Sequence, residues 1–203
     1  MNVFFDLDGT LVDASDRLFR LFQFLVPASS FTKDDYWKLK RDKVSHRQIL
    51  KEHFNFENDK IDSFENTWLS MIELPEWIAY DKPFDQVTTY LKEVQKTHKV
   101  YVVTARQFEK TATAQIHSYG WADIFADILV TGHSVAKADL VVKNVGITNA
   151  DWFVGDTGKD IETGKQLGLR TAAVTCGFLN KERLAEYNPD VIVRSVVELK
   201  FDN

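Results

Sequence analysis

Val3-Phe4-Phe5-Asp6-Leu7-Asp8-Gly9-Thr10 opens the chain with a short apolar run that stops at a carboxylate. An apolar run that ends this abruptly, with a glycine close behind, predicts a buried β-strand followed by a loop. The side chains of Asp6 and Asp8 then lie at the carboxyl end of that strand. Taken alone, such a pair is as compatible with turn or helix-capping residues as with a catalytic site.

The second part of the chain, from Asp81 onward, alternates apolar runs with longer amphipathic stretches. Strands separated by helices of this length form parallel sheets through right-handed crossovers, and helices then cover both faces. We therefore predict an α/β fold with a mostly parallel sheet. The expected strands are 100–103, 128–130, 152–154, 171–174 and an edge strand at 191–193, and the expected helices are 84–97, 107–119, 137–145 and one that ends at 167.

The segment between these two parts is predicted to be helical throughout. Apolar side chains recur at helical spacing from Leu18 to Leu25, whereas Arg17, Arg20 and Gln23 fall on the opposite face. Further helices are expected at 33–40, at 45–54 with Ser45 as the N-cap, and at 60–73. We predict a small all-helical domain of residues 15–80, inserted after the first strand of an α/β domain of residues 1–14 and 81–203. The expected hinges are Asp13-Ala14 and Tyr80-Asp81-Lys82-Pro83, and the aromatic residues expected in the core of the helical domain are Phe19, Phe22, Phe24, Trp37, Phe54, Trp68 and Trp77.

The composition narrows the classes of function. With 203 residues and 44% hydrophobic side chains, the chain can bury a sizeable core. Its formal net charge of -5 argues against a nucleic acid polymer or an anionic membrane surface as a partner. The single cysteine, Cys176, excludes an internal disulfide and a cysteine-cluster metal site, and no apolar run approaches the roughly 20 residues of a membrane span. We expect a cytoplasmic monomer or homodimer that acts on a small molecule.

Polar side chains follow three of the predicted strands directly. Asp6, Thr104 and Asp156 each come at the end of an apolar run, and parallel α/β sheets bind ligands outside the carboxyl ends of their strands. A second acidic cluster, which reaches from Asp156 to Asp160, would lie at the same edge. Several carboxylates in one place repel one another unless a cation joins them, and hard oxygen ligands suit Mg²⁺. The sequence therefore predicts a magnesium site at this edge.

These residue types fit phosphoryl transfer. An aspartate such as Asp6 can attack phosphorus and form an aspartyl-phosphate, which divides hydrolysis into two easier steps. Asp8 is placed to protonate the leaving oxygen and then to deprotonate the attacking water. The oxygens of the transferred group need further donors, which Thr104 and Lys137 can supply. Lys143 is the alternative lysine, but it lies further along the predicted helix and away from the sheet edge.

Taken together, these motifs make the sequence resemble the haloacid dehalogenase (HAD) superfamily, in its phosphoglycolate-phosphatase-like branch. Asp6-Leu7-Asp8-Gly9-Thr10, Thr104, a lysine and Gly155-Asp156 with Asp160 occur in the order of the four family motifs. The resemblance implies a Rossmann-like core with a helical cap, and a hydrolase acting on phosphoric monoesters. It also implies Asp6 as nucleophile, Asp8 as general acid/base, Thr104 and Lys137 as phosphate binders, and Mg²⁺ held by Asp6, the Asp8 main-chain carbonyl and Asp156, with Asp160 supporting the metal shell or orienting the lysine. Substrate contacts are expected at Gly9, Thr10, Ala105 and Arg106.

The helical insert offers further candidates. A basic run lies at the end of its second predicted helix and beyond. The hypothesis is that some of Arg41, Lys43, His46 and Arg47, with Arg41 and Arg47 as the chosen candidates, face the site and bind an anionic group on the leaving portion of the substrate. A solvated helix end is the alternative interpretation.

The identity of the substrate and the class of reaction stay open at this point. An acid at position 8 favours phosphoryl chemistry, because, as the resemblance implies, true dehalogenases carry a non-acidic residue there. The expected substrate is a small phosphorylated metabolite. The alternatives are a phosphosugar mutase of the β-phosphoglucomutase type, a phosphonate hydrolase that uses Lys40 or Lys43 for a Schiff base, and a non-enzymatic sensor of phosphoryl ligands.

Overall fold

The computed structural model describes residues 1–201, and its centre is strand β1 (Asn2–Phe5). Residues 202 and 203, which the predicted α/β domain includes, lie outside the described residues. The sheet has the strand order β5-β4-β1-β6-β7-β8, and every neighbouring pair in it is parallel. The predicted α/β fold is confirmed. The other strands are β4 (Lys99–Thr104), β5 (Asp127–Val130), β6 (Trp152–Gly155), β7 (Arg170–Val174) and β8 (Val191–Val193), which forms the predicted edge.

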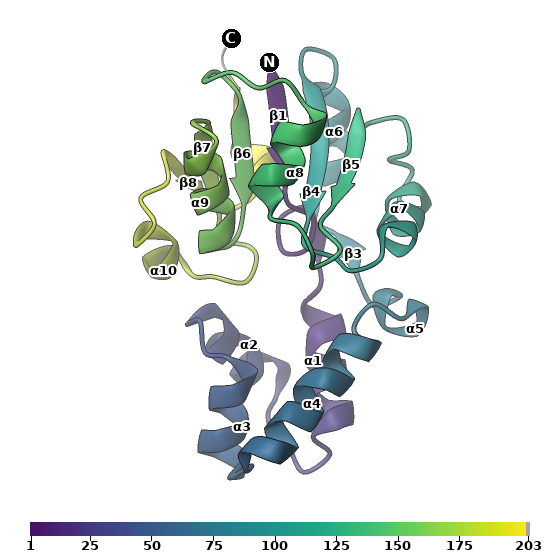
Figure 1. Cartoon of the computed structure of the whole chain (residues 1–203), viewed down its shortest axis with the longest axis vertical. Coiled ribbons are helices and arrows are strands. Elements are labelled where there is room, and N and C mark those ends of the chain that lie inside the picture. Colours follow the sequence, from purple (N-terminus) through teal and green to yellow (C-terminus); the bar gives the residue numbers. More distant parts are fainter. Residues whose placement is uncertain (202–203) are drawn as a thin grey trace.

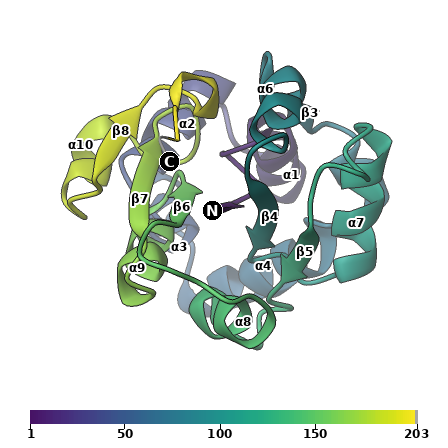
Figure 2. The ribbon, with the colours of Figure 1, turned by 90° about the horizontal axis from the view of Figure 1, so that it is seen from above.

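Helices cover both faces of this sheet (Figure 2). Alternate residues of β1 point to opposite faces, as the period of a strand requires. Phe5 packs with α6 (Val87–Val94) and α7 (Glu109–Ser118), and Phe4 packs with α8 (Lys137–Asn144). Because both faces of β1 pack against apolar side chains, its sequence from Val3 to Phe5 is a continuous apolar run. The remaining elements of this part are α9 (Gly158–Gln166), α10 (Lys181–Ala185) and the short 3-10 helix η1 (Val196–Glu198).

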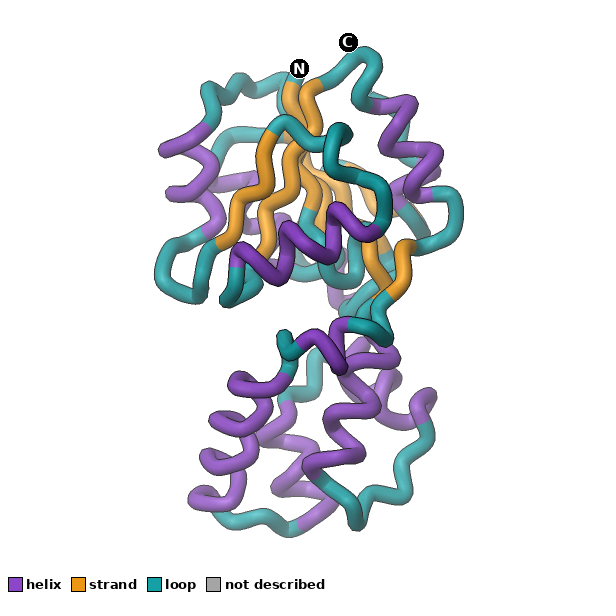
Figure 3. Tube along the Cα trace, turned by 90° about the vertical axis from the view of Figure 1, so that its right-hand side faces the viewer, coloured by secondary structure: helices purple, strands orange, loops and turns teal. Residues whose placement is uncertain are grey.

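The segment after β1 forms a separate layer of helices beyond the carboxyl ends of the strands (Figures 1 and 3). Its core is made of fully buried side chains, each stabilising the fold by roughly 1.5–3 kcal/mol relative to exposure. Thr32 and Ser45 cap two of the helices through capping boxes, as predicted for Ser45. The helices are α1 (Ser15–Leu25), α2 (Lys33–Arg41), α3 (His46–Phe54), α4 (Asn58–Met71) and α5 (Pro75–Ile78), and the buried side chains include Leu21, Phe22, Tyr36, Ile49, Leu50 and Ile61.

The two connections between the layers run side by side. Strand β2 (Val12–Asp13) pairs antiparallel with β3 (Lys82–Pro83), so the predicted hinge segments form a two-stranded ribbon. The pattern did not predict this ribbon, because two-residue strands have no readable period.

Several local predictions were wrong. Arg17 was assigned to the polar outer face of its helix, but it is buried because Asp8 and Asp81 pair with it. Phe24 was assigned to the core of the helical part, but it is 59% exposed and stacks against Trp77. The helix predicted at 84–97 covers only 87–94. Gln86, directly before its first residue, has a positive φ that prevents the helix from beginning at 84.

None of the helices in the described part of the chain is long and apolar enough to cross a lipid bilayer.

Candidate active site

The strand order places three predicted site residues around one crevice. Chain connections leave β1 for β4 on one side and return to β6 on the other, so β1 marks the point where the strand order reverses. Asp6 follows β1, Thr104 ends β4 and Asp156 follows β6. All three are buried. Their meeting follows from the parallel topology alone.

The loop after β1 is folded tightly against Asp156. Leu11 and Val12 both donate their backbone N–H groups to the carbonyl of Leu7, which closes the turn. Gly9 has a φ of 87°, and a Cβ atom there would collide with the Asp156 carboxylate, so only glycine fits. The Thr10 hydroxyl lies 3.4 Å from Asp6 Oδ2 and 3.3 Å from Asp156 Oδ1. Gly9 and Thr10 therefore pack against the carboxylates of the acidic cluster, and neither residue lines the pocket.

The acidic cluster consists of Asp6, Asp156 and Asp160. One oxygen from each lies within 4.8 Å of the others, and all three residues are buried. Burial raises the pKa of Asp6 to about 7, and burial together with Asp6 and Asp160 raises the pKa of Asp156 well above its usual range. Three buried carboxylates at this distance form a set of hard oxygen donors that fits a divalent cation.

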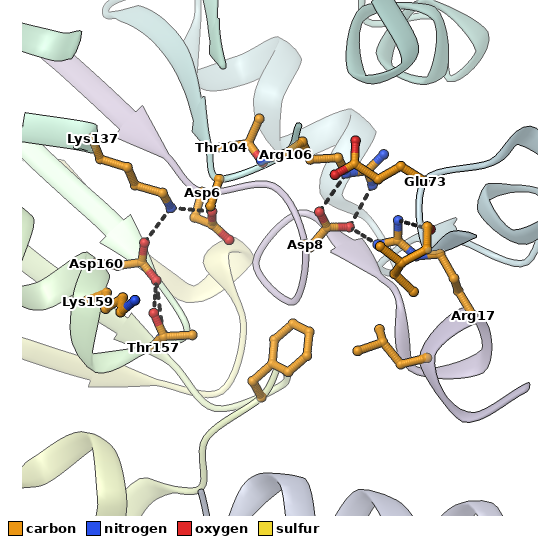
Figure 4. A pocket seen from close by; sticks show the side chains of 14 residues that line it. Asp6, Asp8, Arg17, Glu73, Thr104, Arg106, Lys137, Thr157, Lys159 and Asp160 are labelled. Carbon is orange, nitrogen blue, oxygen red and sulfur yellow. Dashed lines mark hydrogen bonds and ion pairs between the residues drawn. The ribbon is translucent and has the colours of Figure 1, made fainter. Parts of the chain in front are cut away.

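Lys137 is the cation that the structure supplies to this cluster (Figure 4). It is the first residue of α8, and its Nζ donates to Asp6 Oδ1 at 2.5 Å and to Asp160 Oδ1 at 2.7 Å. Although burial opposes it, Asp160 and Asp6 raise the pKa of Lys137 above its usual range. The other oxygen of Asp160 accepts from the N–H and hydroxyl of Thr157, which fixes this carboxylate. Lys143, the alternative lysine, is exposed on the same helix.

Asp8 lies on the opposite side of the pocket from Lys137 (Figure 4). Arg106 binds it through two donors, Nε to Oδ2 at 2.7 Å and Nη2 to Oδ1 at 2.6 Å, and Arg17 Nη2 reaches Oδ1 at 2.5 Å. Burial works against ionisation, but Arg106 and Arg17 outweigh it and hold the pKa of Asp8 below its usual range. In this arrangement Asp8 is an ion-pair partner of both layers, since Arg17 belongs to α1 and Arg106 follows β4.

A pocket of about 300 Å³ joins these two groups. Thr104, Ala105 and Arg106, the predicted phosphate and substrate contacts, line this pocket, and so do residues that were not among the predicted site residues. The signal for Arg17 was its place just after the predicted hinge at Asp13-Ala14, which brings the first turn of α1 near the sheet edge. The other missed lining residues are Leu18, Ile72, Glu73, Thr157, Lys159 and Phe178.

The basic run of the helical layer does not line this pocket. Arg47 pairs with Asp62 and Glu65 on α4, which offer nearer carboxylates. His46 packs among the aromatic rings of the helical core and hydrogen-bonds the Tyr36 hydroxyl at 2.8 Å. The prediction that these two side chains face the site was therefore wrong. Arg41 contacts the sheet layer, since its Nη1 donates to the Gly177 carbonyl at 3.4 Å.

Lys40 and Lys43 also lie outside the pocket. The Nζ of Lys40 donates to the Val44 carbonyl, and that of Lys43 donates to the Tyr187 hydroxyl. Burial lowers the pKa of Lys40 to about 8. Because neither ammonium reaches the acidic cluster, the geometry gives no support to Schiff-base chemistry.

The helical layer is held to the sheet layer on both sides of the pocket. On one side, the Glu73 carboxylate accepts from the backbone N–H groups of Gln107 and Phe108 at 2.8 and 3.2 Å. On the other, Asn180 N donates to the Arg41 carbonyl, and Asn180 Nδ2 donates to Asp42 Oδ1 at 2.7 Å. The helical layer lines the pocket through Arg17 and Leu18 of α1 and through Ile72 and Glu73, which follow α4.

A Rossmann-like sheet with a buried acid cluster at its switch point and a helical roof defines a class of α/β hydrolases. A family model described as haloacid dehalogenase-like hydrolase matches residues 3–174. The chain belongs to this family, as its motifs predicted.

Individual relatives agree over nearly the whole chain. The chain is 26% identical to an N-acetylmuramic acid 6-phosphate phosphatase of Pseudomonas aeruginosa, over 97% of this chain and 92% of that protein. It is 26% identical to a phosphoglycolate phosphatase of Aquifex aeolicus, over 87% of this chain and 85% of that protein. Among solved structures, a haloacid dehalogenase-like hydrolase from Streptococcus pneumoniae superimposes with a TM-score of 0.77, at 23% identity and with 97% and 95% of the two chains covered.

Proposed function

We propose that this protein is a Mg²⁺-dependent phosphatase that hydrolyses a small phosphomonoester through an aspartyl-phosphate on Asp6. The observation that carries the proposal is the buried cluster of Asp6, Asp156 and Asp160 with Lys137, open to a pocket of about 300 Å³. The two curated relatives support it, since N-acetylmuramic acid 6-phosphate and phosphoglycolate, which their names give as substrates, are both small phosphomonoesters.

The first half-reaction starts at the Asp6 carboxylate. One of its oxygens forms a bond to phosphorus as the ester P–O bond breaks, and the leaving oxygen takes a proton from Asp8. Lys137 and the Thr104 hydroxyl are the donors for the oxygens of the transferred group. In the second half-reaction, water gives a proton to Asp8 and attacks phosphorus, which releases inorganic phosphate and restores Asp6.

Asp6, Asp156 and the main-chain carbonyl of Asp8 would hold the metal. Mg²⁺ bound there supplies positive charge that offsets the repulsion between the carboxylate nucleophile and the phosphate. Asp160 orients Lys137 through its hydrogen bond and in this way supports the same cluster.

Asp8 needs a change of partners to act as the acid. Arg106 and Arg17 now bind its carboxylate on the far side of the pocket. An ionised carboxylate has no proton to give. The proposal therefore requires the Asp8 side chain to turn away from the two arginines when substrate is bound and to take up a proton from solvent, which it then gives to the leaving oxygen.

The roof of helices supplies the cap in this proposal. It excludes water from the aspartyl-phosphate until the leaving group departs. The paired strands β2 and β3 are its hinge.

Turnover of p-nitrophenyl phosphate tests the proposed function. We expect activity with Mg²⁺, loss of activity with a chelator, and loss of at least about a thousandfold in Asp6→Asn, because the nucleophile is removed. Asp139→Asn is the matched control, since Asp139 is exposed on α8. Activity that survives the chelator or Asp6→Asn refutes the mechanism. One free phosphate per ester consumed distinguishes hydrolysis from the mutase reaction, which would return an isomerised sugar phosphate.

A further inference from the structure

The pocket has a second charged end that the proposed chemistry does not use. At one end lie Asp6, Asp160 and Lys137, where phosphoryl transfer is proposed, and at the other lie Arg17 and Arg106 (Figure 4). Both arginines line the pocket and are only 3% and 4% exposed. Burial of two neighbouring guanidinium groups costs free energy unless negative charges lie close to them.

Two carboxylates form ion pairs with the two arginines in this structure. Asp8 accepts from both of them, and Asp81 lies 3.1 Å from Arg17 Nε and 3.3 Å from Arg106 Nη2. Glu73 also lines this end and adds a third negative charge, although both of its oxygens accept from backbone N–H groups and none binds an arginine. One further donor, Arg106 Nη1, is buried without a hydrogen-bond partner among the described residues.

The hydrogen bonding of the two arginines changes when Asp8 turns to the leaving oxygen. Three N–H donors then lose the carboxylate that they now bind: Nε and Nη2 of Arg106, and Nη2 of Arg17. Buried donors that are left without an acceptor cost free energy. A single carboxylate at this end of the pocket would restore these hydrogen bonds.

We propose that the substrate supplies this anion: Arg17 and Arg106 form a subsite for a carboxylate on the leaving portion of the phosphomonoester. The inference rests on the proposed function, because it is the catalytic role of Asp8 that vacates the arginines. Arg106 already binds a carboxylate with two donors, which is the geometry that a guanidinium fork prefers. The substrate class is therefore a small phosphorylated carboxylic acid, whose carboxylate releases Asp8 for catalysis as it binds.

Matched pairs of substrates test this on the wild-type protein. 2-Phosphoglycolate is compared with 2-hydroxyethyl phosphate, and N-acetylmuramic acid 6-phosphate with N-acetylglucosamine 6-phosphate; the members of each pair differ chiefly in the carboxylate. We expect kcat/KM to favour the carboxylate in at least one pair by about tenfold or more, the scale of a charge-assisted hydrogen bond. Equal kcat/KM values within both pairs overturn the proposal. The proposal is also overturned if the ratio of kcat/KM for pyrophosphate to kcat/KM for methyl phosphate exceeds the ratio found within either carboxylate pair. The subsite would then bind a second phosphoryl group.

Variants assign the preference to the arginines. Arg17→Lys and Arg106→Lys keep the charge but lose the fork, and each should reduce the carboxylate preference about tenfold. Arg20→Lys, on the exposed side of the same helix as Arg17, should leave the preference unchanged. A preference that survives both substitutions refutes the subsite, and if a variant fails to fold, the wild-type comparison still decides. Absence of any p-nitrophenyl phosphate hydrolysis would instead refute the proposed function, so the two failures are distinguishable.

Discussion

Burial acts directly on Asp6 and raises the pKa of this carboxyl to about 7. A carboxyl with a raised pKa binds its proton more tightly in the folded than in the unfolded chain. Stability therefore falls as the pH rises from about 4, the ordinary value, to about 7. Asn at this position has no proton to lose in that range.

The first prediction concerns the metal-free protein. We expect the Tm of Asp6→Asn to rise relative to wild type as the pH increases from about 5 to about 8, because only the wild type acquires the buried charge. Thermal unfolding of both proteins in a chelator measures this difference. The Tm difference between Asp139→Asn and wild type should stay nearly constant over the same range, and a constant difference for Asp6→Asn would contradict the raised pKa.

Lys137 carries the second prediction at this scale. Lys137→Met removes the cation from Asp6 and Asp160, and the loss of one partner of a buried pair costs about 3–5 kcal/mol. We expect that loss in the free energy of unfolding measured in urea without metal. Lys143→Met, on an exposed position of the same helix, should change stability by less than about 0.5 kcal/mol. Similar effects of the two substitutions would show that Lys137 is not the balancing charge.

Individual residues differ in how far the sequence predicts them. The meeting of Asp6, Thr104 and Asp156 could be predicted, because each follows a strand and parallel strands end at one edge. The burial of Arg17 could not be predicted. Helical spacing describes only the contacts of a residue with its own helix, whereas Arg17 is buried by Asp8 and Asp81, which lie outside that helix.

At the scale of elements, long periodic segments were predicted well and short ones were not. The apolar run of β4 and the amphipathic pattern of α1 are many residues long, so the pattern is readable. The two-residue strands β2 and β3, which pair with each other, and the four-residue helix α5 are too short to have a readable period. For the same reason, the sequence did not predict that the segment after α4 attaches the helical layer to the sheet layer.

Glu73 provides a test of that attachment. Glu73→Gln removes the charge that accepts from Gln107 N–H and Phe108 N–H, and it leaves a single acceptor for two part-buried donors. We expect the free energy of unfolding to fall by about 1.5–3 kcal/mol, the contribution of hydrogen bonds to a charged group. Glu76→Gln, an exposed neighbour, is the control in the same denaturation experiment. If both variants match the wild type, this contact does not hold the two layers together.

At the scale of the whole molecule, the acid cluster links metal binding to stability. Metal ligands must be deprotonated, so binding of Mg²⁺ should become tighter as Asp6 and Asp156 lose their protons. We expect Mg²⁺ to raise the Tm of the wild type more at about pH 8 than at about pH 6. The shift should vanish in Asp156→Asn, as measured by thermal unfolding with and without Mg²⁺. An equal shift in that variant would place the metal elsewhere.

The central claim is that the phosphoryl group passes through Asp6 on its way to water. Each in-line displacement at phosphorus inverts its configuration, so two successive displacements retain it and a direct attack by water inverts it. The decisive measurement is the stereochemical course of hydrolysis of a phosphorothioate ester made chiral with oxygen isotopes, carried out in isotopically labelled water with Mg²⁺. We expect retention of configuration at phosphorus. Inversion would show that water attacks the ester directly and that Asp6 is not the nucleophile.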